Sequence, residues 1–82
     1  MDREKIINIL AQILNIDIEK LNQVGDSDDL SQYSLNSLKA VKLMVRLEEE
    51  LDVEIDDDDL FLKNVDTIEK IRLFTRKYEL KD

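Results

Sequence analysis

The chain of 82 residues is long enough for one hydrophobic core, so we interpret residues 1–82 as a single domain. It contains no Cys and no His, which excludes a disulfide scaffold, the usual zinc ligands and a nucleophile activated by His. The formal net charge of −8 disfavours nucleic acid and anionic membranes as partners, and it favours basic patches on other proteins.

The first predicted element is a helix over residues 2–14. Its apolar residues recur at helical spacing, and Asp2 is a suitable N-cap. Residues 16–21 then alternate between apolar and polar side chains. We interpret this segment as an extended stretch or a single helical turn that packs Ile16, Ile18 and Leu21 on the core.

A long loop is predicted over residues 22–34, where turn-forming residues replace the apolar repeat. Val24, Leu30 and Tyr33 are the side chains expected to anchor this loop. Loops of this length in small domains are often functional.

The next predicted helix covers residues 37–51 and has the strongest apolar pattern of the chain. One apolar row contains Leu38, Val41 and Val45, and the adjacent row contains Ala40, Leu43, Met44, Leu47 and Leu51. The two rows form a wide apolar arc, so we expect this helix to be buried on more than one side. The glutamates at 48–50 are interpreted as a solvated face.

The last third of the chain predicts a short helix and a long one. The acidic run 56–59 would cap the short helix, with residues 60–62 turned partly inward. The run lacks the ligand spacing of a calcium-binding EF-hand loop, so we expect no metal site there. Asp66 and Glu69 fit a capping box for a final helix over residues 67–78. Its predicted apolar face consists of Ile68, Ile71, Phe74 and Tyr78.

These elements predict an all-α fold of three long helices and one short one, with a long loop between the first two long helices. Ser37 stands where that loop meets the apolar helix over residues 37–51. A hydroxyl at this position is exposed beside N–H groups that have no intrahelical acceptor, which favours a phosphate there. Considered alone, Ser37 is better explained as a simple N-cap, because Ser is common at helix starts.

The triplet Asn36-Ser37-Leu38 is followed by the wide apolar helix and by the run Glu-Glu-Glu-Leu-Asp-Val-Glu-Ile at residues 48–55. This arrangement resembles the phosphopantetheine attachment region of acyl and peptidyl carrier proteins, in which Asp-Ser-Leu opens the second helix. The resemblance extends over most of the chain. It implies an acyl-carrier-like four-helix bundle in which Ser37 bears 4'-phosphopantetheine derived from coenzyme A.

The chain departs from the family pattern at two positions near this serine. Asn36 replaces the common Asp, which keeps a hydrogen-bonding side chain and removes a charge. Ser34 stands where the family usually has Gly. We interpret Ser34, and Ser27 after Asp26, as turn or capping residues because neither opens an apolar helix.

Three cations, Lys39, Lys42 and Arg46, are spaced to lie on one stripe of the predicted 37–51 helix. Fatty-acid-synthesis carriers typically have acidic residues there, so we expect a specialised biosynthetic pathway rather than housekeeping fatty acid synthesis. A solvated stripe that pairs with Glu49 and its neighbours is an equally weighted alternative. The predicted partner-recognition residues are Asn36, Leu38, Lys39, Val41, Lys42 and Arg46.

The resemblance implies a stand-alone carrier that is not an enzyme. A phosphopantetheinyl transferase would install the arm, an acyl- or aminoacyl-loading ligase would attach cargo as a thioester, and downstream acyl-transfer enzymes would receive it. Fatty acyl, polyketide, aminoacyl and peptidyl cargoes all fit this scheme. The alternatives are a small acidic helical adaptor and a degenerate carrier, both without a covalent cofactor.

The sequence also carries expectations about location and assembly. The charged N-terminus has no apolar run typical of a signal peptide, and no segment is long enough to span a membrane. We therefore expect a soluble cytoplasmic monomer that neither binds nucleic acid nor inserts into a membrane.

Overall fold

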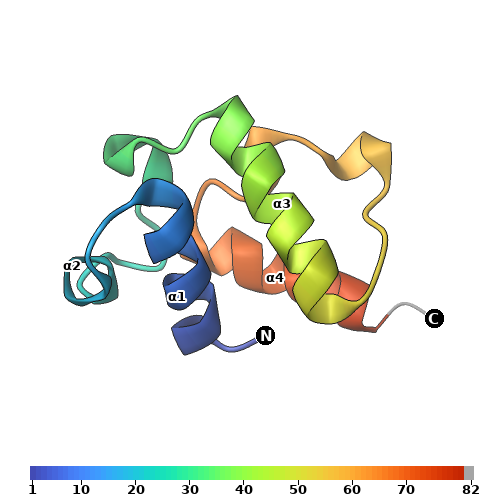
Figure 1. Ribbon diagram of the computed structural model, residues 1–82, viewed down its shortest axis with the longest axis horizontal. Helices are drawn as coiled ribbons and strands as arrows, with labels where there is room; N and C mark the ends of the chain where they lie inside the picture. Colours follow the sequence, from blue (N-terminus) through green and yellow to red (C-terminus); the bar gives the residue numbers. More distant parts are fainter. Residues whose placement is uncertain (81–82) are drawn as a thin grey trace.

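The computed structural model describes residues 1–80, in which the secondary structure is entirely helical. The long helices are α1 (Arg3–Leu14), α3 (Ser37–Leu51) and α4 (Ile68–Glu79), and the short one is α2 (Ile18–Asn22) (Figure 1). Three 3-10 turns, η1 (Leu30–Tyr33), η2 (Asp57–Asp59) and η3 (Leu62–Asn64), lie in the connections. The predicted all-α bundle of three long helices and one short helix is confirmed.

The short helix forms in the segment that we interpreted as an extended stretch or a single helical turn, and not near residues 56–62. It occupies residues 18–22, within the connection between α1 and α3, whereas the short helix predicted near residues 56–62 is replaced by η2 and η3. Four successive aspartates explain this difference, because Asp is a poor residue inside a helix and like charges three apart repel one another. Phe61 there is exposed rather than turned inward.

The core lies where α1, α3 and α4 meet. Figure 1 shows α3 crossing in front of α4, with α1 beside them, and each pair of these helices is in contact. The fully buried side chains include Ile6, Leu10, Leu43, Leu47, Ile68 and Ile71. The predicted α4 face, Ile68, Ile71, Phe74 and Tyr78, is confirmed as buried. Within residues 1–80, no helix has the length and apolar character required to cross a membrane.

Side chains cap the starts of α1 and α4. Asp2 accepts the Lys5 N–H at 2.9 Å, as predicted. The predicted cap of α4 is wrong by one residue, because Thr67 Oγ1 accepts the Lys70 N–H at 3.0 Å and the helix begins at Ile68. The Asp66 carboxylate instead forms an ion pair with Lys70 Nζ at 3.0 Å. Either side chain can cap a helix, so residue type alone did not distinguish them.

The long connection between α1 and α3 is anchored by burial and by hydrogen bonds. Val24 and Leu30 are buried as predicted, and Tyr33 is half-buried. Arg3 Nη2 donates to the Val24 carbonyl at 2.7 Å, and the Leu30 N–H donates to the Asp66 carbonyl at 2.8 Å. These bonds attach the connection to α1 and to the segment that enters α4.

The burial of two side chains, Ile18 and Glu48, differs from the sequence predictions. Ile18, expected to pack on the core, is 44% exposed, whereas Leu21 of the same helix is fully buried. A five-residue helix has room for only one buried face. Glu48 is not solvated, because its half-buried carboxylate accepts the Ile55 N–H at 2.8 Å and so fixes the turn after α3. Glu50 pairs with Lys5 of α1 at 3.1 Å, and Glu49 is exposed.

Tyr78 attaches the acidic segment 56–59 to α4. Its hydroxyl donates to Asp59 Oδ2 at 2.5 Å and accepts the Asp56 N–H at 3.1 Å. Lys77 Nζ also donates to Asp59, at 3.0 Å. Burial, together with the Asp59 carboxylate, raises the pKa of Tyr78 above its ordinary value of 10.0.

This raised pKa predicts a loss of stability at high pH. Above about pH 10 an unfolded tyrosine ionises while folded Tyr78 keeps its proton, so the free energy of unfolding should fall as pH rises. The fall attributable to one such group is at most about 1.4 kcal/mol per pH unit. Urea unfolding of the wild type and of Tyr78→Phe across this range measures it, with Tyr33→Phe as control. Parallel pH profiles for wild type and Tyr78→Phe would contradict the prediction.

Candidate functional site

Ser37, the predicted attachment residue, is the first residue of α3 and is exposed. Leu35, two residues earlier, is buried in the core, and its N–H donates to the Leu30 carbonyl at 3.2 Å. The chain is therefore held in place immediately before Ser37, at the upper end of α3 in Figure 1. The hydroxyl stands at an accessible point on a well-anchored helix end.

Asn36 caps this helix end. Its backbone is extended, and its side-chain oxygen accepts the Lys39 N–H at 2.9 Å. The first backbone bond of the helix runs from the Ala40 N–H to the Asn36 carbonyl at 2.8 Å. The N–H groups of Ser37 and Leu38 precede that bond, so they have no intrahelical acceptor. With the helix dipole and a neutral cap, they favour an anion beside Ser37.

The turn before the site contains a residue in a strained backbone conformation. Asp29 accepts the Ser31 N–H at 2.9 Å, which lowers the pKa of the Asp29 carboxyl, and η1 ends at Ser34 with φ at 77°. This left-handed conformation costs a residue with a Cβ roughly 1–2 kcal/mol and costs Gly nothing. The interpretation of Ser34 as a capping residue is confirmed, and its φ gives a physical reason for the family's usual Gly.

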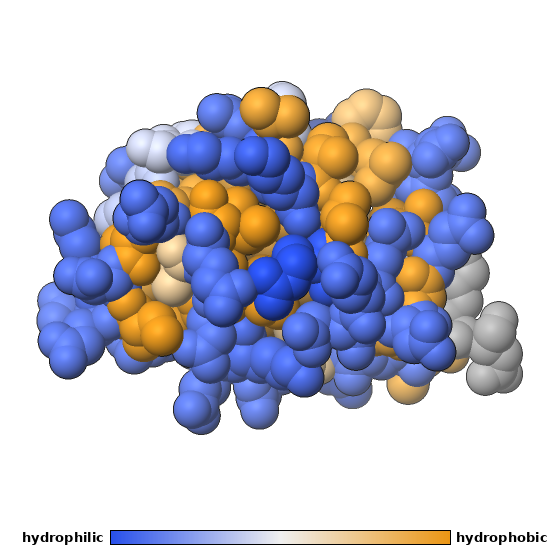
Figure 2. Space-filling model, in the orientation of Figure 1, coloured by the Kyte–Doolittle hydropathy of each residue, from blue (hydrophilic) through white to orange (hydrophobic). Residues whose placement is uncertain are grey.

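The apolar row that continues from Ser37 along α3 faces solvent. Leu38 is 67% exposed, Val41 44% and Val45 47%. The expectation that α3 is buried on more than one side is therefore wrong: the buried row is Ala40, Leu43, Met44 and Leu47. Figure 2 shows apolar patches among hydrophilic residues on this face, one of them over the upper part of α3. Exposed leucine and valine beside the site provide a surface for protein contact.

The three predicted cations beside this row have different surroundings. Arg46 is half-buried, donates to Gln12 Oε1 of α1 at 2.6 Å, and lies 3.8 Å from a Glu50 carboxylate oxygen. Among the described residues, no carboxylate forms an ion pair with Lys39 or Lys42. Lys42 is exposed and Lys39 is half-buried. The structure thus brings Lys42 to the surface near the apolar row and holds Arg46 against α1.

Comparison with known proteins identifies the family. The family model for the phosphopantetheine attachment site matches residues 4–71. The chain belongs to this family of phosphopantetheine-binding carrier proteins. The acyl carrier protein of Buchnera aphidicola subsp. Schizaphis graminum (strain Sg) is 43% identical over 68 residues, which are 82% of this chain and 80% of that protein. The acyl carrier protein of Buchnera aphidicola subsp. Acyrthosiphon pisum (strain Tuc7) is 37% identical over 78 residues, 95% and 92% of the two chains.

Membership in the carrier protein family gives the cofactor, which is covalently attached 4'-phosphopantetheine. The residues at the start of α3 fit this group, since an exposed hydroxyl, backbone N–H groups and an uncharged cap meet there. Within residues 1–80, no group of three acidic side chains is placed to hold a metal ion. Carrier proteins of this family are non-catalytic.

Sequence reasoning did not anticipate the exposure of Val45 or the backbone strain at Ser34. The exposed row was visible as one edge of the apolar arc, but periodicity does not tell which edge faces the core. The signal for Ser34 was the family's usual Gly at that position, because Gly after a turn points to a positive φ.

Replacing Ser34 by Gly should stabilise the carrier. The backbone strain that Gly removes at position 34 is larger in free energy than the cost of the extra backbone freedom that Gly gives the unfolded chain. The free energy of unfolding should therefore rise by about 0.5 kcal/mol. Asn15 provides the control, because it is also left-handed, with φ at 55°, but Asn tolerates this conformation. Urea unfolding of both variants measures the difference. A larger gain for Asn15→Gly than for Ser34→Gly would refute this explanation.

Proposed function

We propose that Ser37 bears the 4'-phosphopantetheine arm and that the chain is an acyl carrier. The observation that supports this most strongly is the exposed hydroxyl at the capped start of α3, inside the segment matched by the family model. The other candidate serines are less suitable. Ser34 ends a 3-10 turn, and Ser27 lies in the long connection, so neither stands at the start of an α-helix.

In the proposed modification, a phosphopantetheinyl transferase brings coenzyme A to Ser37. The hydroxyl loses its proton, a bond forms from Ser37 Oγ to the phosphorus attached to pantetheine, and the bond from that phosphorus to the adenosine bisphosphate group breaks. The N–H groups at the start of α3 would lie close to the resulting phosphodiester anion. The bound arm supplies a thiol, which a chain without Cys lacks.

We assign partner recognition to the exposed side of α3. Leu38 and Val41 supply apolar contacts next to Ser37, and Asn36 determines the direction in which the helix begins. Lys39 and Lys42 add positive charge to the same side of the helix. This arrangement suits a partner surface that combines an apolar socket with carboxylates.

The cations on α3 are also the basis for proposing a specialised pathway. Their positive charge is opposite to the negative charge expected on this surface of a carrier for housekeeping fatty acid synthesis. The solvated-stripe alternative has support at Arg46, which pairs with Glu50, but not at Lys42. The relatives are named acyl carrier proteins, which favours acyl over aminoacyl or peptidyl cargo.

The proposal includes partners and cellular context. The chain itself would catalyse no reaction, and an acyl-loading ligase and downstream acyl-transfer enzymes would act on its cargo. A single domain, a monomeric state and a cytoplasmic location remain predictions from the sequence.

Modification should add a single arm at Ser37. Intact-mass analysis after incubation with a broad-specificity phosphopantetheinyl transferase and coenzyme A should show one added phosphopantetheine, which peptide mapping should locate on Ser37. Ser37→Ala should take up none, whereas Ser34→Ala and Ser27→Ala should be modified like the wild type. Modification of Ser37→Ala would overturn the assignment, and an unmodified wild type would favour the degenerate carrier.

Charge reversal at Lys42 should slow transfer to the cognate partner. Lys42 is exposed beside the apolar row, so Lys42→Glu should leave stability within about 0.5 kcal/mol. The transfer rate at low salt should fall severalfold, and added salt should reduce the difference because it screens charges across the interface. Lys20→Glu on α2 makes the same charge change elsewhere and should have little effect. Equal rates for both variants would identify Lys42 as part of a solvated face.

A further inference from the structure

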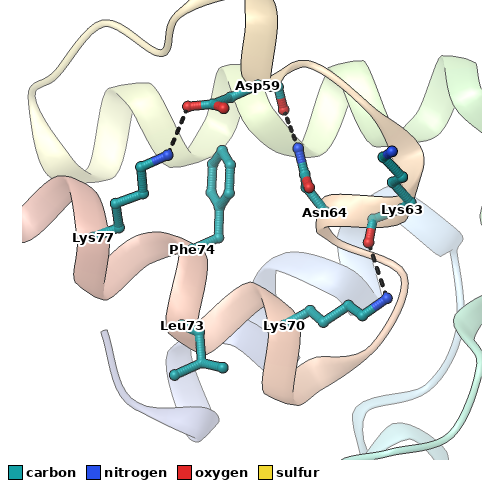
Figure 3. Close-up of a pocket in the computed structure, with 7 residues that line it drawn as sticks. All are labelled: Asp59, Lys63, Asn64, Lys70, Leu73, Phe74 and Lys77. Atoms are coloured by element: carbon teal, nitrogen blue, oxygen red, sulfur yellow. Dashed lines mark hydrogen bonds and ion pairs between the residues drawn. The ribbon is translucent and has the colours of Figure 1, made fainter.

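An open hollow lies between the segment 59–64 and α4. It has a volume of about 480 Å³. Figure 3 shows that α4 supplies Leu73 and Phe74, with Phe74 directed toward Asp59 and Leu73 directed away from it, and that α3 lies behind the lining residues. Three cations, Lys63, Lys70 and Lys77, and one carboxylate, Asp59, lie around the hollow. None of these residues belongs to the surface that we assign to the arm and its partners on α3.

Apolar side chains at this hollow are exposed to solvent. Leu73 is 59% exposed although it lies in the middle of α4. Phe61, next to the lining segment, is 54% exposed, and the Lys63 ammonium lies 5.9 Å from the centre of its ring. Exposed apolar side chains beside a hollow offer a surface for contact with an apolar side chain of a partner.

The charge of this region is opposite to that of the rest of the chain. Residues 59–80, which include the whole lining of the hollow, contain five cationic and four acidic side chains, whereas residues 1–58 contain six cationic and fifteen acidic ones. Two cations at the hollow form ion pairs with half-buried carboxylates: Lys70 lies 3.0 Å from Asp66, and Lys77 lies 3.0 Å from Asp59. Lys70 Nζ also donates to the Lys63 carbonyl at 3.1 Å. The side chains of both lysines are exposed to solvent, so each ammonium group can approach a further carboxylate.

We propose that this hollow, here called the α4 hollow (Lys63, Lys70, Leu73, Phe74 and Lys77), docks an acidic segment of a partner protein that carries an apolar side chain. The apolar side chain would contact exposed Leu73 and the small accessible edge of the otherwise buried Phe74, and flanking carboxylates would lie near the lysines. A symmetric pair of copies with the hollow on its two-fold axis would place lysines against lysines. An anionic membrane is disfavoured by the net charge of −8.

This docking is independent of the proposed modification of Ser37. The α4 hollow is formed by α4 and residues 59–64, so a segment bound there leaves the start of α3 uncovered. A partner could thus hold the carrier through a tail while the arm on α3 stays accessible. A second, weak contact between the α4 hollow and the partner would raise the effective concentration of the carrier at that partner.

Nuclear magnetic resonance titration of the full-length apo protein tests the proposal. The probe is a synthetic peptide of alternating glutamate and leucine, and the control peptide has glutamine in place of every glutamate. The acidic peptide should cause saturable chemical-shift changes confined to residues 59–64 and 70–77, and high salt should weaken its binding. The glutamine peptide should bind at least tenfold more weakly. Shifts centred on α3, or equal binding of the two peptides, would overturn the proposal.

Matched variants locate the contact. The double variant Lys63→Glu and Leu73→Ser should weaken binding of the acidic peptide about tenfold, since it removes one charge contact and one apolar contact. Ile18→Ser with Lys20→Glu makes a comparable change on α2 and should leave binding unaltered. Both pairs are exposed, and thermal melting checks that the variants fold. Equal weakening by the two pairs would contradict the proposal.

Three further measurements separate this inference from its competitors and from the modification of Ser37. Stronger binding of the apo protein to phosphatidylserine vesicles than to the peptide would assign the α4 hollow to a membrane. Shifts at the same residues on raising protein concentration alone would assign it to a second copy. Ser37→Ala should bind the peptide like the wild type, so loss of modification and loss of docking are observed independently.

Discussion

The burial of one face of α3 against α1 and α4 is the constraint on which the rest of this molecule depends. No disulfide or cysteine-bound metal can stabilise the chain, so the apolar side chains of three helices must provide its stability. Once Leu43, Met44 and Leu47 face the core, the helical repeat places Leu38, Val41 and Val45 on the outside. The packing of α3 therefore also produces the apolar surface beside Ser37.

A few polar contacts then position the start of α3. The connection that precedes it is long, yet Leu35 is buried, the Leu30 N–H bonds to the Asp66 carbonyl, and Arg3 bonds to the Val24 carbonyl. These contacts attach the connection to α1 and to the segment that enters α4. An exposed hydroxyl on an anchored helix end is what a modifying enzyme needs, since it can approach Ser37 without reordering the loop.

The sequence predicted the elements whose signals are local and missed those that depend on tertiary contacts. The bounds of α3, the cap at Asp2 and the buried face of α4 follow from periodicity and cap residues, which act within a few positions. The exposed row of α3, the exposure of Ile18 and the half-buried Glu48 could not be predicted in this way. In each case a neighbouring element decides which face is covered, and no single segment contains that information. The identity of Thr67 as cap was equally undecided, because Asp66 alongside it is as good a cap.

Among residues 1–80, three residues that are not glycine, Asn15, Ser34 and Asp52, have a positive φ, and the chain's only Gly, at position 25, does not. A residue other than glycine at such a turn strains the backbone of the folded chain. It also restricts the unfolded chain, because a backbone with so little glycine and no long flexible tract samples fewer conformations before folding. Less entropy is then lost when the bundle forms. A short domain without cross-links gains from this restriction, so part of its stability has its origin in the disordered state rather than in any contact of the folded one.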